Sequence, residues 1–215
     1  MEKQNSKNNK SKIIYLVLGL ISIITIIAVL IISRIEPPKI EPPIGAIITP
    51  APNVEEIDKP SIMTNVIIET NKGNIKIGLF DNHRPITVNN FLSLIEKDFY
   101  DRIIFHRVID DFMIQAGCPY GTGFGGPGYV IECELEGYNR NMRGTISMAN
   151  AGLNTGGSQF FINLVNNHHL NELHSVFGRV IEGIEIVDAI SNVVTGQGNR
   201  PIEDVVIKNI EIIKE

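Results

Sequence analysis

The chain of 215 residues contains no tryptophan and only two cysteines. Two cysteines are too few for a disulfide framework or for a zinc site built from thiolates. An excess of basic residues is also lacking, because the formal net charge is -5, and nucleic-acid-binding domains usually present a basic stripe. Since 43% of the residues are hydrophobic, the chain can build a core without cross-links. We therefore expect a globular domain that does not bind nucleic acid.

Several catalytic motifs are absent as well. The sequence has no Gly-x-Ser-x-Gly elbow for a serine nucleophile, and it has neither a His-Glu-x-x-His metal helix nor a phosphate-binding glycine loop. The glycine-rich stretch 121–128 leads into a strand-like run at 129–131, so it indicates a mobile loop and not a dinucleotide site. His168 and His169 have no carboxylate or thiol partner at ligand spacing. We expect no metal and no cofactor.

A long uncharged segment near the N-terminus predicts a membrane anchor. Four lysines precede the run from Ile13 to Ile32, and about 20 helical residues span the roughly 30 Å hydrocarbon core. A cleaved signal peptide is the alternative, but it would have a shorter apolar region and a small-x-small cleavage site. We therefore expect a basic cytoplasmic tail at 1–12 and an uncleaved anchor at 13–33. Basic residues stay in the cytoplasm, which predicts a single-pass protein with an extracytoplasmic C-terminal domain.

Residues 34–60 are rich in proline, with seven of the chain's 11 prolines. Such a segment favours extended polyproline conformation and would act as a semi-rigid stalk. A disordered tether is equally compatible with the sequence. A proline-rich ligand for a partner domain is a weaker alternative, because the segment has no clear repeat.

The remaining residues, 61–215, have the pattern of a mainly β domain. The Asn-Lys-Gly-Asn connection at 71–74 predicts a hairpin, and Val88, Phe91, Leu92 and Ile95 form an apolar helical face after Pro85. A second helix is expected at Ile184–Ser191. Strands are expected at 66–70, 75–80, 103–108, 112–116, 144–149, 160–164 and 176–180, with a last one inside 202–213. Many short strands with two helices predict a barrel or sandwich with helical caps.

Arg107 is unusual because it interrupts an apolar, strand-like run. Strand alternation predicts that Phe105 and Arg107 share one face and that His106 lies on the other. An arginine close to Phe112 and Met113 is typical of an apolar ligand pocket with one fixed donor. A surface arginine in a salt bridge is the alternative, and these residues alone favour it.

Two segments resemble the signature segments of cyclophilin-type peptidyl-prolyl isomerases: FHRVIDDFMIQ at 105–115 and MANAGLNTGGSQFF at 148–161. The stretch HSVFG at 174–178 also fits the family pattern, and the resemblance extends from about Asn65 to Glu215. It implies a closed eight-stranded antiparallel β-barrel capped by two helices. It also implies a rotamase that acts on proline-containing polypeptides during protein folding.

The resemblance assigns roles to eleven residues. The expected catalytic residues are Arg107, Phe112, Gln115 and His174. Arg107 stabilises the twisted amide, and Gln115 positions it. The expected substrate-binding residues are His106, Met113, Ala149, Asn150, Gln159, Phe161 and Leu170. The apolar members hold the proline ring, and the others line the pocket or bind the flanking peptide. Isomerisation breaks no covalent bond, which explains why no nucleophile is needed.

Three questions stay open at the level of sequence. Many eukaryotic cyclophilins have a tryptophan that contributes to cyclosporin binding where this chain has His169, so cyclosporin binding is uncertain. Cys118 and Cys133 would either form a disulfide or remain free thiols. The domain could also serve as a binding module without turnover, although the intact Arg107, Phe112 and Gln115 favour an enzyme. A barrel that holds a small ligand is disfavoured, because Ile, Val and Phe would fill its interior.

Overall fold

The structure is a computed structural model, and it describes residues 60–213. The predicted cytoplasmic tail, the anchor at 13–33 and the linker up to residue 59 lie outside these residues, as do the last two positions. Within 60–213, no helix has both the length and the apolar character that crossing a membrane requires.

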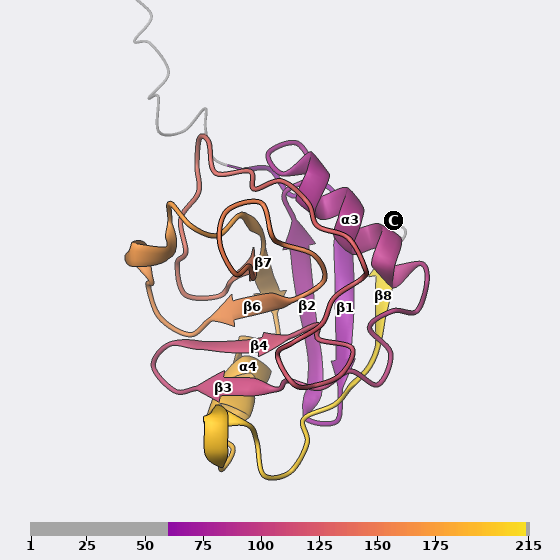
Figure 1. Ribbon diagram of the computed structural model, residues 1–215, viewed down its shortest axis with the longest axis vertical. Helices are drawn as coiled ribbons and strands as arrows, with labels where there is room; N and C mark the ends of the chain where they lie inside the picture. Colours follow the sequence, from indigo (N-terminus) through magenta and orange to yellow (C-terminus); the bar gives the residue numbers. More distant parts are fainter. Residues whose placement is uncertain (1–59, 214–215) are drawn as a thin grey trace, which may run out of the picture. The chain divides into compact units, whose positions relative to one another are not determined.

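The described residues form one eight-stranded sheet with two α-helices (Figure 1). The strands are β1 (Asn65–Thr70), β2 (Gly73–Leu79), β3 (Arg107–Ile109), β4 (Met113–Ala116), β5 (Thr145–Met148), β6 (Phe160–Asn163), β7 (Val176–Glu182) and β8 (Ile207–Ile213). The helices are α3 (Pro85–Ile95) and α4 (Ile184–Ser191), and two 3-10 turns, η1 (His168–Leu170) and η2 (Gln197–Asn199), complete the set. The strand order is β3-β4-β6-β5-β7-β2-β1-β8, and every neighbouring pair is antiparallel.

The hairpin expected at the start of the domain is present as β1 and β2. Thr70 pairs with Gly73, so Asn71 and Lys72 form the connection. The Thr70 hydroxyl donates to the Gly73 carbonyl at 2.7 Å and accepts the Lys72 amide at 3.0 Å. Gly73 has a φ of +136°, which a residue with a Cβ rarely adopts. On its other side β1 pairs with β8, and Asn65, its first residue, lies opposite Ile213, the last residue of β8.

The sheet is curled, and its two edge strands, β3 and β8, do not pair with each other along a ladder. The residues just before these strands join instead. Ile104 and Val206 form an isolated bridge, and the Phe105 amide donates to the Val205 carbonyl at 2.9 Å. The closed barrel expected from the family resemblance is thus corrected to a curled eight-stranded sheet whose edges meet through short loop contacts.

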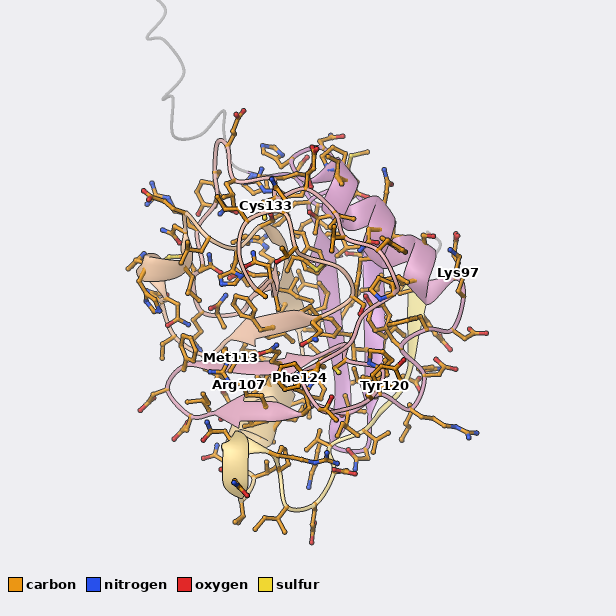
Figure 2. All side chains as sticks on the ribbon, viewed as in Figure 1. Lys97, Arg107, Met113, Tyr120, Phe124 and Cys133 are labelled. Carbon is orange, nitrogen blue, oxygen red and sulfur yellow. The ribbon has the colours of Figure 1, made fainter. Side chains whose placement is uncertain are left out.

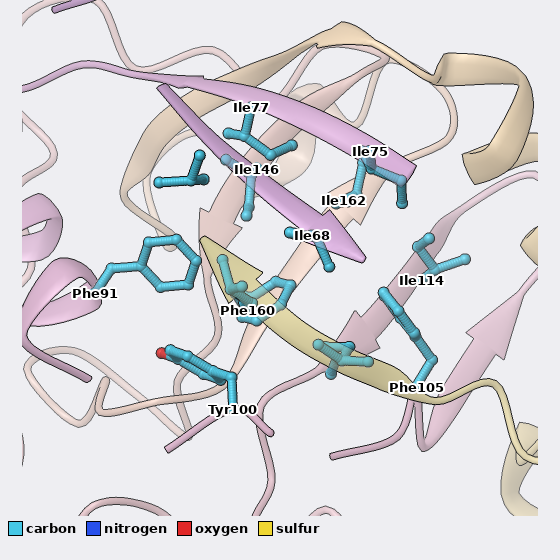
Figure 3. Close-up of a cluster of buried hydrophobic side chains, with 14 of the residues drawn as sticks. Ile68, Ile75, Ile77, Phe91, Tyr100, Phe105, Ile114, Ile146, Phe160 and Ile162 are labelled. Carbon is cyan, nitrogen blue, oxygen red and sulfur yellow. The ribbon is translucent and has the colours of Figure 1, made fainter. Parts of the chain in front are cut away.

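The concave side of the sheet is filled by apolar side chains from strands and helices (Figure 3). Ile68, Ile75 and Ile77 from the first hairpin are completely buried. The ring of Phe91, from α3, lies 5.1–5.6 Å from the rings of Tyr100, Phe160 and Phe177. Val187 and Ile190 extend the same core from α4. The interior is therefore occupied by side chains, which argues against a barrel that encloses a small ligand.

The third strand differs from its expected form. It begins at Arg107 and not at Ile103, so strand alternation does not extend back to Phe105. Phe105 is completely buried in the core, whereas Arg107 is half-buried and lines a surface pocket. The expectation that these two residues share a face was wrong for this reason.

Two further segments are settled by the structure. Residues 129–131 form no strand, and only Ile131 makes an isolated bridge, with Gly156. Both cysteines are free thiols, with Cys118 buried and Cys133 partly exposed. The Cys133 sulfur accepts the Asn154 amide at 3.2 Å.

Candidate active site

A cavity of about 180 Å³ lies on the outer side of β3, β4 and β6. It brings together nine of the eleven residues singled out from the sequence: Arg107, Phe112, Met113, Gln115, Ala149, Asn150, Phe161, Leu170 and His174. We refer to this cavity as the proline pocket. Figure 2 shows Arg107 and Met113 on the face formed by β3 and β4, with Phe124 from the glycine-rich loop nearby.

Strand alternation explains how one strand supplies both the core and the pocket. In β4, Ile114 and Ala116 are buried in the main core. Met113 and Gln115 point the other way and line the proline pocket. Pairing places Arg107 opposite Gln115 on one side of β4 and Phe161 opposite Gln115 on the other. The side chains of three adjacent strands therefore meet at one place.

The floor of the proline pocket is apolar. Met113, Phe161 and Leu170 are buried and form a small cluster separate from the main core, with Phe112 and Ala149 packed against it. Leu170 comes from η1, which carries it toward strand β6. Such an apolar cavity with few polar groups at its edge is typical of a small-ligand site.

Arg107 is held at the edge of this apolar floor. Its Nη1 donates to Gln115 Oε1 at 3.3 Å and lies 4.0 Å from the Met113 sulfur. Its guanidinium carbon lies 5.9 Å from the centre of the Phe112 ring, within the range of a cation–π contact. None of the ion pairs among residues 60–213 includes Arg107, so the salt-bridge alternative raised by the sequence is not supported.

A chain of hydrogen bonds continues from Arg107 to the glycine-rich loop. Gln115 Nε2 donates to Gln159 Oε1 at 3.0 Å, and Gln159 Nε2 donates to the carbonyls of Gly123 and Gly125, each at 2.9 Å. The amide orientation of Gln115 is thereby fixed with its oxygen toward the guanidinium. Gln159 does not line the proline pocket but belongs to the next cavity.

That neighbouring cavity has a volume of about 560 Å³ and lies under the glycine-rich loop. It shares Gln115, Ala149 and Asn150 with the proline pocket, and Gln159 also lines it. We refer to it as the flanking groove. Because they share these three lining residues, the two cavities adjoin each other.

His174 lies at the rim of the proline pocket in its neutral form. Burial lowers the pKa of His174, as does the nearby His169, while a contact with the Met148 carbonyl opposes the shift. Because a carbonyl only accepts, His174 Nδ1 carries the proton and donates to Met148 at 3.1 Å. The imidazole also packs edge-on against Phe161, with ring centres 5.2 Å apart.

His106 is placed apart from the other site residues. It lines neither the proline pocket nor the flanking groove, and only 6% of its surface is exposed. Burial, together with the charges of Arg107 and Arg200, lowers the pKa of His106 to about 4, although a contact with the Ile104 backbone opposes the shift. At neutral pH it is therefore an uncharged side chain behind the arginine.

Sequence reasoning missed a group of buried asparagines behind the pocket. Asn167 Nδ2 donates to the Phe112 carbonyl at 2.9 Å and to Asn163 Oδ1 at 2.8 Å. Asn163 in turn donates to Asn141 at 3.2 Å. These bonds fix the backbone that presents Phe112. The polar run at 166–169 was the available signal, but an asparagine in a polar run looks like an ordinary loop residue.

Within the described part of the chain, no group of three or more His, Cys, Asp and Glu side chains is arranged to hold a metal ion. Among residues 60–213, the charged or titratable groups that line the pocket are Arg107 and the neutral His174. The arrangement can therefore bind an apolar ring and offer one fixed positive charge beside it.

Comparisons with known proteins agree on one family. The family model described as "Cyclophilin type peptidyl-prolyl cis-trans isomerase/CLD" matches residues 65–212. A peptidyl-prolyl cis-trans isomerase of Synechococcus elongatus is 51% identical over 132 residues, covering 60% of this chain and 90% of the relative. One of Helicobacter pylori is 49% identical over 139 residues, covering 63% and 83%.

Solved structures give the same result. A cyclophilin-type isomerase of Cryptosporidium parvum superposes with a TM-score of 0.68 at 36% identity, covering 71% of this chain and 98% of that one. A crystal structure of this relative in the presence of the dipeptide Ala-Pro superposes with the same TM-score at 37% identity, covering 70% and 99%.

Proposed function

The chain belongs to the family of cyclophilin-type peptidyl-prolyl cis-trans isomerases, and on this premise we propose that Arg107 is the residue that accelerates rotation about the X-Pro bond. The activity itself, cis–trans isomerisation of peptide bonds before proline, is that of the family. The observation that carries the assignment is a guanidinium fixed by Gln115 at the edge of a 180 Å³ apolar pocket.

The proline pocket suits a proline ring. Phe112, Met113, Phe161 and Leu170 offer apolar contact on several sides, and the ring is small enough for a cavity of this size. The Ala-Pro dipeptide used with the Cryptosporidium relative supports the same substrate class for this chain. Anchoring the ring leaves the residue before proline free to turn.

Rotation requires loss of the partial double bond between carbon and nitrogen, which gives a barrier of about 18–20 kcal/mol. In the twisted transition state the prolyl nitrogen becomes pyramidal and carries a lone pair. A positive donor aimed at this nitrogen stabilises the twisted state more than either planar isomer, and therefore lowers the barrier. Arginine fits this role because it remains charged at all physiological pH values. Gln115 keeps the guanidinium in place by accepting its hydrogen bond.

The flanking groove is assigned to the peptide next to proline. Ala149, Asn150 and Gln159 line it, and the Ala149 amide is already bonded to the Gln159 carbonyl at 2.9 Å. The amide oxygens of Asn150 and Gln159 each accept one hydrogen bond within the domain, so each keeps a further lone pair that can accept from an extended backbone. His174 contributes the pocket rim as a neutral ring against Phe161.

The decisive experiment measures proline isomerisation by residues 61–215 and by three variants. We expect Arg107→Ala to lower kcat/KM by about 10²-fold or more, since one electrostatic donor to the transition state is lost. Arg107→Lys keeps the charge but loses the planar fork, so it should retain only part of the activity.

Lys97→Ala, which removes an exposed cation elsewhere, is the matched control and should behave as the parent. Near-normal turnover by Arg107→Ala, in a protein that unfolds at the parental temperature, would exclude this role for Arg107. If the parent binds a proline peptide but does not isomerise it, the domain is a binding module and not an enzyme.

The cellular role follows from the N-terminal third of the sequence. The lysine-flanked apolar run and the proline-rich linker support a single-pass protein whose isomerase domain lies outside the membrane. In that position the enzyme would act on exported proteins as they fold, when X-Pro bonds still exchange over tens to hundreds of seconds.

A further inference from the structure

A third cavity, of about 830 Å³, lies at the other end of β5, where it meets β7. Three arginines line it: Arg140 and Arg143 from the loop before β5, and Arg179 from β7. Among residues 60–213, no acidic side chain lines it, although acidic side chains outnumber basic ones in the chain by 24 to 19. We refer to this cavity as the arginine groove.

One of the three arginines is already engaged. Arg143 Nη1 donates to the Leu164 carbonyl at 2.9 Å, and its Nη2 bonds both carboxylate oxygens of Asp188 at 2.8 and 2.9 Å. The charge of Asp188 is thus paired with that of Arg143, and Asp188 itself does not line the groove. Arg143 is therefore a structural support for the loop and not the principal anion ligand.

The other two arginines are exposed and available. The guanidinium of Arg140 lies over the Tyr138 ring, 5.5 Å from its centre, which holds it in place. Arg179 is fixed through its strand position opposite Thr145. Among the ion pairs of residues 60–213, none includes Arg140 or Arg179. Glu182, the nearby acid on β7, is bonded to Lys76 at 2.9 Å.

The rest of the groove has the character of a binding site for an organic group. Phe80, Met142, Val180 and Ile181 supply apolar surface beside the two guanidiniums. A cavity of 830 Å³ is larger than a single inorganic anion needs and falls in the range of small-molecule sites. The combination favours a ligand with a charged head and an apolar or neutral body.

We propose that the arginine groove binds a phosphate monoester, with its phosphate between Arg140 and Arg179 and its organic part along the apolar wall. A carboxylate has two oxygens and one charge, which a single guanidinium fork satisfies. A phosphate monoester offers three acceptor oxygens and close to two negative charges at pH 7.5, so it can engage two forks at once. The proposal is independent of the isomerase mechanism, because neither arginine lines the proline pocket or the flanking groove.

Isothermal titration of the full chain in neutral detergent at pH 7.5 tests the proposal, with phenyl phosphate as the probe. Phenyl phosphate should bind more tightly than benzoate, which has the same ring and a carboxylate. Arg140→Gln and Arg179→Gln should each weaken the binding about tenfold, since each removes one charge-assisted contact, and the double variant should give no measurable heat of binding.

The double variant Lys97→Gln/Lys208→Gln removes the same charge from exposed positions outside the groove and should bind like the parent. Isomerase activity of Arg140→Gln/Arg179→Gln should also equal that of the parent, which shows that the variant is folded. If the isomerase assignment fails, the binding comparison still stands, because the thermal unfolding temperature of the double variant then shows that it is folded.

A soluble short-chain phosphatidic acid distinguishes two sources of the phosphate. Tighter binding than phenyl phosphate would identify a lipid headgroup, and equal binding would identify a soluble ester; both support the site. The proposal is overturned if phenyl phosphate does not bind, if benzoate or a glutamate-rich peptide binds as tightly, or if the double arginine variant keeps the parental affinity.

Discussion

His106 and Arg107 are consecutive in the chain but experience opposite environments. Arg107 lines a cavity open to solvent, whereas His106 is buried behind it and kept neutral at physiological pH. A charge on His106 would lie beside the Arg107 and Arg200 guanidiniums in a poorly solvated place. The folded domain therefore favours the neutral form of His106.

This difference predicts an acid-sensitive stability. The pKa of His106 is about 4 in the folded state and 6.5 when unfolded, so the unfolded state binds more protons between these values. Stability is fully present above pH 6.5 and falls as the pH drops toward 4, by about 3 kcal/mol from this residue. Urea unfolding of the parent and of His106→Gln at several pH values measures the difference.

Between pH 6.5 and 4, His106→Gln should lose less unfolding free energy than the parent. The contribution of His174, whose pKa is also lowered, should be the same in both proteins. Equal pH dependence in the two proteins would contradict the assignment of the effect to His106.

Because of His169, we expect cyclosporin to inhibit this protein only weakly. Its imidazole stacks on Phe112, with ring centres 5.9 Å apart at 18°, and it occupies the position at which many eukaryotic cyclophilins have tryptophan. Imidazole offers a smaller apolar surface than indole. We expect His169→Trp to inhibit at a lower cyclosporin concentration than the parent, with turnover of a short proline peptide changed less. Tight inhibition of the parent would show that the histidine is no obstacle.

Residue-level sequence reasoning succeeded where a motif carried the geometry. The two signature segments contain seven of the nine predicted residues that line the proline pocket, and Leu170 and His174 follow in the region of wider family resemblance. It could not place Phe105 on the core side, because that depends on where β3 begins. It could not find Asn163 and Asn167 either, since their hydrogen bonds reach Asn141 and the Phe112 carbonyl, which lie 22 and 55 residues away in the sequence.

At the scale of elements, helix α3 depends on a carboxylate from another part of the chain. Its N-cap residue, Arg84, makes no side-chain capping bond, and its first turn has no acidic residue. Glu134 supplies the acceptor instead, taking the amides of Ile86 and Thr87 at 3.0 and 2.8 Å and the Thr87 hydroxyl at 2.7 Å. A negative group at this end also complements the helix dipole.

Glu134→Ala should therefore lower the free energy of unfolding by about 2 kcal/mol, because two helix amides and a hydroxyl lose a charged acceptor. Glu134→Gln keeps one acceptor oxygen and should lose less. Thermal unfolding ranks the three proteins. Glu136 is an exposed neighbour. If Glu134→Ala lowers the free energy of unfolding no more than Glu136→Ala does, the capping role is contradicted.

The elements differ in how well sequence predicted them. Helix α4 has the predicted bounds, Ile184–Ser191, because its apolar period and the glycine before it agree. The three-residue turn η1 was not predicted, since so short a piece has no period to detect. The run at 129–131 looked like a strand by composition but has no neighbouring strand along which to form a ladder.

At the scale of the whole molecule, the fold places core and pocket on opposite sides of the same strands. The sequence predicted the number of strands and helices, but not that β3 and β8 meet only through the residues before them. Whether a curled sheet closes depends on its shear, which no local pattern reports.

The proposed membrane anchor leads to a prediction about the whole molecule. If the isomerase domain is extracytoplasmic, trypsin added to intact cells should cut the linker, where Arg34 and Lys39 offer sites, and release a fragment close to 40–215. A cytoplasmic marker protein should stay intact in the same cells. Complete protection of the domain until the cells are lysed would reverse the proposed orientation.

The pairing of Asn65 with Ile213 has a consequence for engineering. The domain's entry and exit points are neighbours on adjacent strands β1 and β8, so a short linker could join them and new ends could be opened in a surface loop. A circularly permuted isomerase, or one spliced as a cassette into a loop of a host protein, should therefore retain its architecture.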